Sequence, residues 1–137
     1  MESGSVQVSR DEIPDEVRKL IAEHIVSVEQ LEVLLLLRSR AGETWSPEGI
    51  SEVIRTSASS AEQRLRDLEA RGFLAREEGK SSYRYTPGGR WERALELLTQ
   101  LYSERHYTVI ELIFSKPIQN LRVYSDAFLF RKDPSDG

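Results

Sequence analysis

Polar side chains between residues 59 and 84 have types and spacing that suit the binding of a negatively charged polymer. Gln63 and Arg66 are three residues apart, so a helix would carry both on one face. A glutamine can form paired hydrogen bonds to adenine, and an arginine to guanine. Arg76, Lys80 and Arg84 follow at intervals of four residues. Cations of this kind contact phosphates beside a groove, so the first hypothesis is recognition of a nucleic acid.

Each assignment has a simpler alternative. Gln63 and Arg66 could instead lie on an exposed helix face and contact only water. Arg76 and Arg84 can instead pair with Glu77 or Glu78 across a hairpin, and exposed pairs of this sort contribute under about 1 kcal/mol. The residue types alone leave both interpretations open.

The sequence carries no pattern that indicates an enzyme. No glycine-rich phosphate loop follows a strand, and neither a GxSxG motif nor a metal-ligand spacing occurs. The lack of cysteine excludes disulfides and thiolate metal sites, and the chain has only two histidines, His24 and His106. We expect both to be ordinary helix-surface residues. The sequence therefore predicts neither catalysis nor a metal or other cofactor.

A predicted pair of short helices, joined by a tight turn, carries the first of these polar residues. The first helix is PEGISEVI, with Ser46 as its cap and Pro47 in its first turn. The second is SSAEQRLRDLEARGF, in which Ser59 and Glu62 form a capping box. Glu62 could also accept a hydrogen bond from cytosine, but the box accounts for it without a ligand. We therefore expect this helix to begin at Ser59 and to end at Gly72.

The second helix has two distinct sides at about 100° per residue. The apolar side, which should face the core, carries Ala61, Leu65 and Leu68. The opposite side carries Ser59, Gln63, Arg66 and Ala70.

A two-stranded ribbon follows the second helix. Its turn consists of Glu78, Gly79 and Lys80, which is a hairpin signal. In its second strand Tyr83 and Tyr85 alternate with polar residues, as in a half-buried strand. Two helices, a tight turn and a ribbon in this order are the layout of a winged helix-turn-helix. There the second helix and the ribbon tip project from one side, where a DNA groove and its flanking phosphates can be met together.

Two further helices are expected before this pair. Pro14 starts the segment PDEVRKLIAEHI, whose apolar residues recur at three and four residues. Ser27 and Gln30 form another capping box, and the helix after it, VEQLEVLLLLRSR, is apolar on most faces. We expect it to be the buried central helix, with Gly42 in the left-handed conformation after its end.

A long helix is expected from Trp91 to Ser115, and it should run roughly 37 Å at 1.5 Å per residue. One small domain cannot easily cover a helix of that length. A near-heptad stripe along it predicts a dimer seam, with residues 14–25 packed beside it. The seam residues are Trp91, Leu95, Leu98, Tyr102, Val109 and Leu112. The alternative is that the stripe folds back on the core of its own chain.

A last helix, IQNLRVYSDAFLF, is expected after Pro117. Phe128, Leu129 and Phe130 at its end either anchor a partner or close a core. The sequence then divides into a disordered N-terminus at 1–12, a winged helix-turn-helix domain with its leading helix at 13–90, a C-terminal helical dimerisation or interaction segment at 91–131, and a disordered tail at 132–137.

Length and charge limit the possible functions. The 137 residues suffice for one domain with a core, and the net charge of −4 opposes non-specific binding to phosphates. Residues 46–90 nevertheless carry eight basic and seven acidic side chains, whereas residues 1–45 carry five and nine. No apolar run is long enough to span a bilayer and no apolar leader is present, so we expect a cytoplasmic protein without a membrane partner.

From about residue 28 to residue 87 the chain resembles bacterial winged-helix regulators of the MarR and PadR kind. The resemblance lies in VEQLEVLLLLRSR, SPEGISEVI, SSAEQRLRDLEARGFL and the SYRYTP strand. It implies a mainly α fold with a small β-wing, flanked by an N-terminal helix and long C-terminal helices that dimerise. The residues implied to contact DNA are Ser59, Ser60, Gln63, Arg64 and Arg66 in the recognition helix, and Arg76, Lys80 and Arg84 in the wing.

The sequence thus predicts a homodimeric transcriptional regulator that binds double-stranded DNA, with a palindromic operator as its site. It departs from that pattern in its carboxylates, which repel phosphate. These are Glu62, Asp67 and Glu69 in the recognition helix, and Glu77 and Glu78 in the wing. The departure favours a second hypothesis, in which the winged helix is a protein-interaction module. Its partner would then be a regulatory protein, such as a sigma factor or another regulator.

Overall fold

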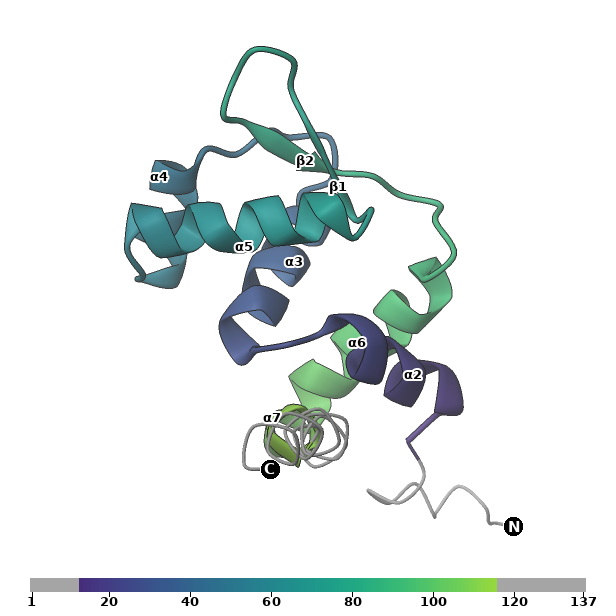
Figure 1. Cartoon of the computed structure of the whole chain (residues 1–137). Helices are drawn as coiled ribbons and strands as arrows, with labels where there is room; N and C mark the ends of the chain where they lie inside the picture. The colour runs from purple at the N-terminus through teal and green to yellow at the C-terminus, as the bar shows by residue number, and fades with distance from the viewer. Residues whose placement is uncertain (1–12, 116–137) are drawn as a thin grey trace, which may run out of the picture.

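The computed structural model of the chain describes residues 13–115 (Figure 1). In chain order its elements are α2 (Asp15–His24), α3 (Val28–Ser39), α4 (Pro47–Ile54), α5 (Ala58–Ala70), β1 (Leu74–Arg76), β2 (Tyr83–Tyr85), α6 (Glu92–Glu104) and α7 (His106–Ser115). The predicted helix after Pro117, with its candidate anchor, and the predicted disorder at 1–12 and 132–137 lie outside the described residues. Within them, no helix is both long and apolar enough to cross a membrane.

The first helix of the pair, α4, has the predicted bounds. Ser46 has an extended backbone, and its hydroxyl accepts a hydrogen bond from the Gly49 amide at 3.0 Å. Pro47 occupies the first turn. Backbone N–H groups there have no partner within the helix, so a proline costs the helix no hydrogen bond. The helix ends at Arg55, whose backbone is left-handed with φ 68°. The tight turn that follows brings the chain directly into α5.

The predicted start of α5 at Ser59 is wrong. The helix begins earlier, and its cap is Ser57, whose hydroxyl accepts from the Ser60 amide at 3.0 Å. Ser57 is extended, with φ −78° and ψ 156°, which lets its side chain reach back over the first turn. Ser59 already lies inside the helix and cannot cap it. Glu62, the predicted partner in the capping box, pairs with Arg66 instead.

The ribbon forms as predicted, and a third segment extends it. β1 and β2 are antiparallel, with Leu74 opposite Tyr85. Tyr83 and Tyr85 are buried while Arg84 between them is exposed, which is the predicted alternation. Trp45 adds two backbone hydrogen bonds to Tyr83, at 2.8 and 2.9 Å. The ribbon is therefore attached both to the end of α5 and to the chain that enters α4.

The core lies where α3 packs against α4, α5 and β2. As predicted, Ser27 caps α3, because its hydroxyl accepts from the Gln30 amide at 3.0 Å. The fully buried apolar residues of α3 are Leu31, Val33, Leu34 and Leu37. Those that α5 contributes are Ala61, Leu65 and Leu68, the predicted stripe.

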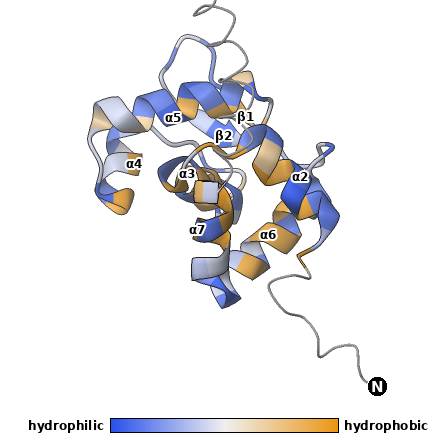
Figure 2. Cartoon of the chain, turned by 60° about the horizontal axis from the view of Figure 1, so that its bottom comes forward, coloured by the Kyte–Doolittle hydropathy of each residue, from blue (hydrophilic) through white to orange (hydrophobic). Residues whose placement is uncertain are grey.

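The predicted single helix over residues 91–115 is wrong. α6 ends at Glu104, and Arg105 leaves the helical region with φ −133° and ψ 62° before α7 begins. α7 packs against both α6 and α2, and Figure 2 shows apolar residues along these helices. The break lets Val109 and Ile113, both buried, join the core that α6 shares with α2.

The position of the α5 cap is open to a direct test. Ser57→Ala removes the hydroxyl that satisfies the Ser60 amide, so it should lower the free energy of unfolding by about 1 kcal/mol. Ser59→Ala is the matched control and should change stability by less than about 0.5 kcal/mol. Urea denaturation of the two variants measures both values. A larger loss for Ser59→Ala would restore the predicted cap.

Candidate nucleic-acid interface

The outer face of α5 is open to solvent as predicted. Ser59, Gln63, Arg66 and Ala70 are all exposed, and they lie opposite the buried stripe of the same helix. In Figure 1 the ribbon loop rises above α5, whereas α2, α6 and α7 gather below it. The ribbon loop therefore lies on the other side of α5 from these lower helices.

Two of the predicted groove residues are held on the flank of α5. Glu29 of α3 accepts a hydrogen bond from the Ser60 hydroxyl at 2.9 Å and another from Arg64 Nε at 2.8 Å. The ion pair is about three-quarters covered, with side-chain exposures of 30% for Arg64 and 25% for Glu29. A hydrogen bond from Thr56, then those from Arg64 and Ser60, lowers the pKa of Glu29 against the opposing effect of burial. This cluster fixes the start of α5 on the start of α3.

Arg66, on the outer face, has a weaker attachment. It pairs with Glu62 one turn earlier at 3.0 Å, and its side chain is 68% exposed. Exposed pairs of this kind contribute under about 1 kcal/mol, so another anion can displace Glu62. At the far end of the helix Arg71 pairs with Asp67 at 3.0 Å. Each arginine along α5 and its C-cap is therefore matched by a carboxylate.

The wing cations differ from those of α5. Arg76, Lys80 and Arg84 are all exposed, and none is paired with a carboxylate among residues 13–115. Arg76 and Arg84 therefore do not form the alternative ion pairs with Glu77 or Glu78. Arg76 lies opposite Tyr83, whereas Arg84 lies opposite Ala75, so the two arginines leave opposite faces of the ribbon. Lys80 is the last residue of the turn, and its amide donates a hydrogen bond to the Glu77 carbonyl at 3.0 Å.

Glu92 holds the base of the wing. Its Oε1 accepts from the Tyr85 hydroxyl at 2.7 Å and from the Gly88 amide at 3.1 Å, and its Oε2 accepts from Arg38 at 3.0 Å. The Tyr85 hydrogen bond, before the others, lowers the pKa of Glu92. Burial and then Glu92 raise the pKa of Tyr85 to about 12. One carboxylate thus joins β2, α6 and the end of α3.

Neither Glu29 nor Glu92 was found from the sequence. Their partners lie 35 and 54 residues away, in Arg64 and Arg38, so no local spacing signals the pairs. Both carboxylates position other residues and neither faces the open surface. Among the described residues, moreover, no three histidine, cysteine or acidic side chains gather where they could hold a metal ion.

The arrangement of α4, α5 and the ribbon defines the chain as a winged helix-turn-helix protein. A solved structure to which the chain is similar is that of MepR, a transcription regulator of the Staphylococcus aureus multidrug efflux pump MepA. The two share 13% sequence identity with a TM-score of 0.47, over 83% of this chain and 88% of MepR. No protein-family model and no curated protein matches the sequence.

The Glu29 cluster should make stability depend on pH. Because the folded chain lowers the pKa of Glu29, its ionised form stabilises the fold above about pH 4.5, and this contribution is lost as pH falls through the lowered value. Glu29→Gln should therefore cost roughly 1 kcal/mol at pH 7 and progressively less in acid. Glu52→Gln, at an exposed position of α4, is the control. Urea denaturation at pH 7 and pH 3.5 would contradict this account if both variants lost equal stability.

Proposed function

We propose that the chain is a sequence-specific, DNA-binding transcriptional regulator that acts as a homodimer in the cytoplasm. α5 enters the major groove with Ser59, Gln63 and Arg66 toward the bases. The proposed phosphate contacts on the wing are Arg76, Lys80 and Arg84. The proposal is supported by the exposed outer face of α5, by wing cations that pair with no carboxylate among residues 13–115, and by a ribbon loop that lies on the other side of α5 from α2, α6 and α7 (Figure 1).

The ion pairs of α5 are compatible with this function. A guanine edge or a phosphate has to displace only the carboxylate of Glu62, whose side chain is 36% exposed, to reach Arg66. Ser60 and Arg64 complete the proposed contact set from the flank, where a phosphate competes with Glu29 for the Arg64 guanidinium. The more exposed Arg66–Glu62 pair is weaker than the Arg64–Glu29 pair, which is about three-quarters covered, so we propose that Arg66 contributes more than Arg64 to base recognition.

The proposed dimer uses residues that one chain leaves uncovered. Of the seam residues, Leu95, Leu98 and Val109 are already buried within a single chain. Trp91, Tyr102 and Leu112 are half-buried. α7 also exposes two large side chains seven residues apart, Tyr107 at 82% and Phe114 at 68%. We propose that these open residues meet a second copy, which would set the two α5 helices about 34 Å apart, one duplex turn.

Base contacts and phosphate contacts can be separated by two variants. We expect Gln63→Ala/Arg66→Ala to weaken binding to a duplex selected from random DNA by roughly 1–3 kcal/mol per lost bidentate contact, with little effect on a random duplex. Arg76→Ala should weaken both duplexes alike and reduce the salt slope by about 1. Fluorescence anisotropy over a salt series measures both. Undiminished selectivity in the double variant would show that α5 does not read the bases.

The proposed dimer predicts a mass of twice the 15.7 kDa chain in sedimentation. Tyr107→Ser/Phe114→Ser should yield monomers, because both side chains are exposed and their loss does not reach the core. Val53→Ser, which removes an apolar side chain that is 55% exposed on α4, is the control and should remain dimeric. Dimers that persist in the double variant would place the interface elsewhere.

One observation favours a second function, a winged-helix module that binds a regulatory protein partner instead of DNA. Every arginine along α5 is already neutralised by a carboxylate, and Glu69, Glu77 and Glu78 add negative charge nearby. A salt titration with random duplex distinguishes the functions. The regulator loses affinity steeply as salt rises, whereas the protein-binding module shows no binding to titrate.

A further inference from the structure

Arg84 lies between two buried tyrosines of β2, and each tyrosine is attached to another element. The Tyr83 amide and carbonyl bond to the backbone of Trp45, which precedes α4, at 2.9 and 2.8 Å. The Tyr85 hydroxyl donates to Glu92 Oε1, in the first turn of α6, at 2.7 Å. Because side chains alternate along a strand, Arg84 points away from its two buried neighbours and is exposed.

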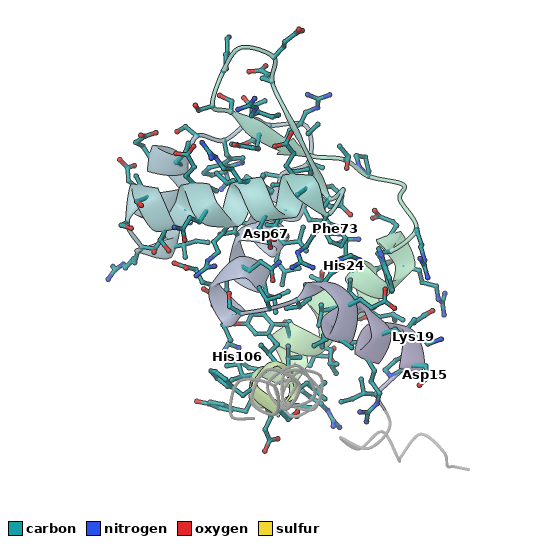
Figure 3. All side chains as sticks on the ribbon, in the orientation of Figure 1. Asp15, Lys19, His24, Asp67, Phe73 and His106 are labelled. Atoms are coloured by element: carbon teal, nitrogen blue, oxygen red, sulfur yellow. The ribbon has the colours of Figure 1, made fainter. Side chains whose placement is uncertain are left out.

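The next residue, Thr86, attaches the base of β2 to the end of α5. Its amide and its hydroxyl both donate to the Phe73 carbonyl, at 3.0 and 2.9 Å. Phe73 is buried, and its ring centroid lies 5.3 Å from that of His24. Figure 3 shows Phe73 and His24 between α5 and α2. The backbone on both sides of Arg84 is therefore attached to parts of the chain outside the ribbon.

The Glu92 carboxylate that holds Tyr85 is itself held by other groups. Its Oε2 accepts from Arg38 at 3.0 Å, and only 20% of that arginine side chain is exposed. Its Oε1 also accepts from the Gly88 amide at 3.1 Å. Burial and then Glu92 raise the pKa of Tyr85 to about 12, so the hydroxyl keeps the proton that it donates at neutral pH. The Tyr85 hydroxyl is thus bonded to a carboxylate that α6 carries and that Arg38 of α3 fixes.

The tip of the wing has no such attachment. The Glu77 amide donates to the Ser82 carbonyl at 2.8 Å, and the Lys80 amide donates to the Glu77 carbonyl at 3.0 Å. Both hydrogen bonds lie within the tip, and in Figure 1 this loop rises away from the helices. Lys80 and Arg84 are both exposed, and neither pairs with a carboxylate within residues 13–115. The two cations therefore differ in how firmly their backbone is held.

We propose that Glu92 is a positioning residue for Arg84: through Tyr85, it fixes the backbone from which the Arg84 guanidinium reaches a phosphate. This inference rests on the proposed DNA-binding function. A group that is already in place loses less conformational freedom when it binds. Arg84 therefore contributes more to phosphate binding than Lys80 does, and its advantage depends on the hydrogen bond between Tyr85 and Glu92.

A double-mutant cycle in the full-length chain tests this role, with the affinity for a random duplex at low salt as the readout. In the wild-type background, Arg84→Ala should weaken binding by about tenfold, and Lys80→Ala by about threefold or less. Tyr85→Phe removes only the hydroxyl that Glu92 holds. In the Tyr85→Phe background we expect Arg84→Ala to cost about threefold, whereas the effect of Lys80→Ala should change by less than about twofold.

Tyr83→Phe is the matched control. It removes a hydroxyl from the same face of β2 and leaves the hydrogen bond between Tyr85 and Glu92 in place. In that background Arg84→Ala should still cost about tenfold. Every wing variant should keep its preference for the selected duplex over the random one within about twofold, because phosphate contacts carry no sequence information. A merely unfolded variant would lose that preference.

Equal effects of Arg84→Ala in the wild-type and Tyr85→Phe backgrounds would overturn the inference and leave the proposed function in place. Absence of duplex binding by the wild type would overturn the proposed function, and the inference with it.

A second measurement needs no substitution. NMR relaxation of the free wild type should give the Arg84 amide an order parameter of about 0.85, the value of rigid backbone, and the Lys80 amide a value below about 0.6. An Arg84 amide as mobile as that of Lys80 would contradict the fixed backbone, and the inference would fail whatever the binding data.

Discussion

The position of α5 depends on one buried amide. Gln30 is the only polar side chain among the described residues that is fully buried, and a buried amide is costly unless its groups are bonded. Its oxygen accepts from the Val26 amide at 2.7 Å, and its nitrogen donates to the His24 carbonyl and to Asp67. A shift of α5 relative to α2 and α3 would break these bonds inside the core. The amide therefore restricts how the three helices can be arranged.

Carboxylates extend this restraint over the surface of the winged helix. Glu29 holds the start of α5 on α3, Asp67 holds its end through Arg71, and Glu92 holds the base of the ribbon. These carboxylates hold Arg64, Arg71 and Arg38 in place, and they also neutralise the positive charge of each arginine. Unpaired positive charge remains on the wing, and an exposed, weakly paired arginine remains on the outer face of α5. In the proposed regulator, shape and wing charge thus bring the protein to DNA despite its net charge of −4.

The sequence was informative wherever one residue and its near neighbours decide the conformation. The cap and proline of α4, the buried stripe of α5 and the alternation in β2 all follow from local patterns, and each is confirmed. At the start of α5 the sequence TSASS offers several serines, and only the extended backbone of Ser57 selects the cap. Local pattern could not choose between them.

The errors that concern tertiary structure have another origin. Nothing in the segment around Arg105 breaks a helix by composition, and the stripe of apolar residues continues across it. After the bend, α7 packs against both α6 and α2, and its residues Val109 and Ile113 are buried. The ion pairs of Glu29 and Glu92 likewise join residues that become neighbours only through the fold. Such features depend on packing between distant segments, which periodicity does not encode.

The central claim, that α5 and the wing form the surface that binds a duplex, is tested most directly by an NMR titration of the isotope-labelled chain with the selected DNA. The account predicts that the amide resonances of the outer face of α5, with the Arg66 Nε and Arg84 Nε signals, shift together on binding. Those of α2 and α7 should stay within the scatter of a free-protein control. Shifts confined to α2 and α7, or none at all at millimolar duplex, would contradict it.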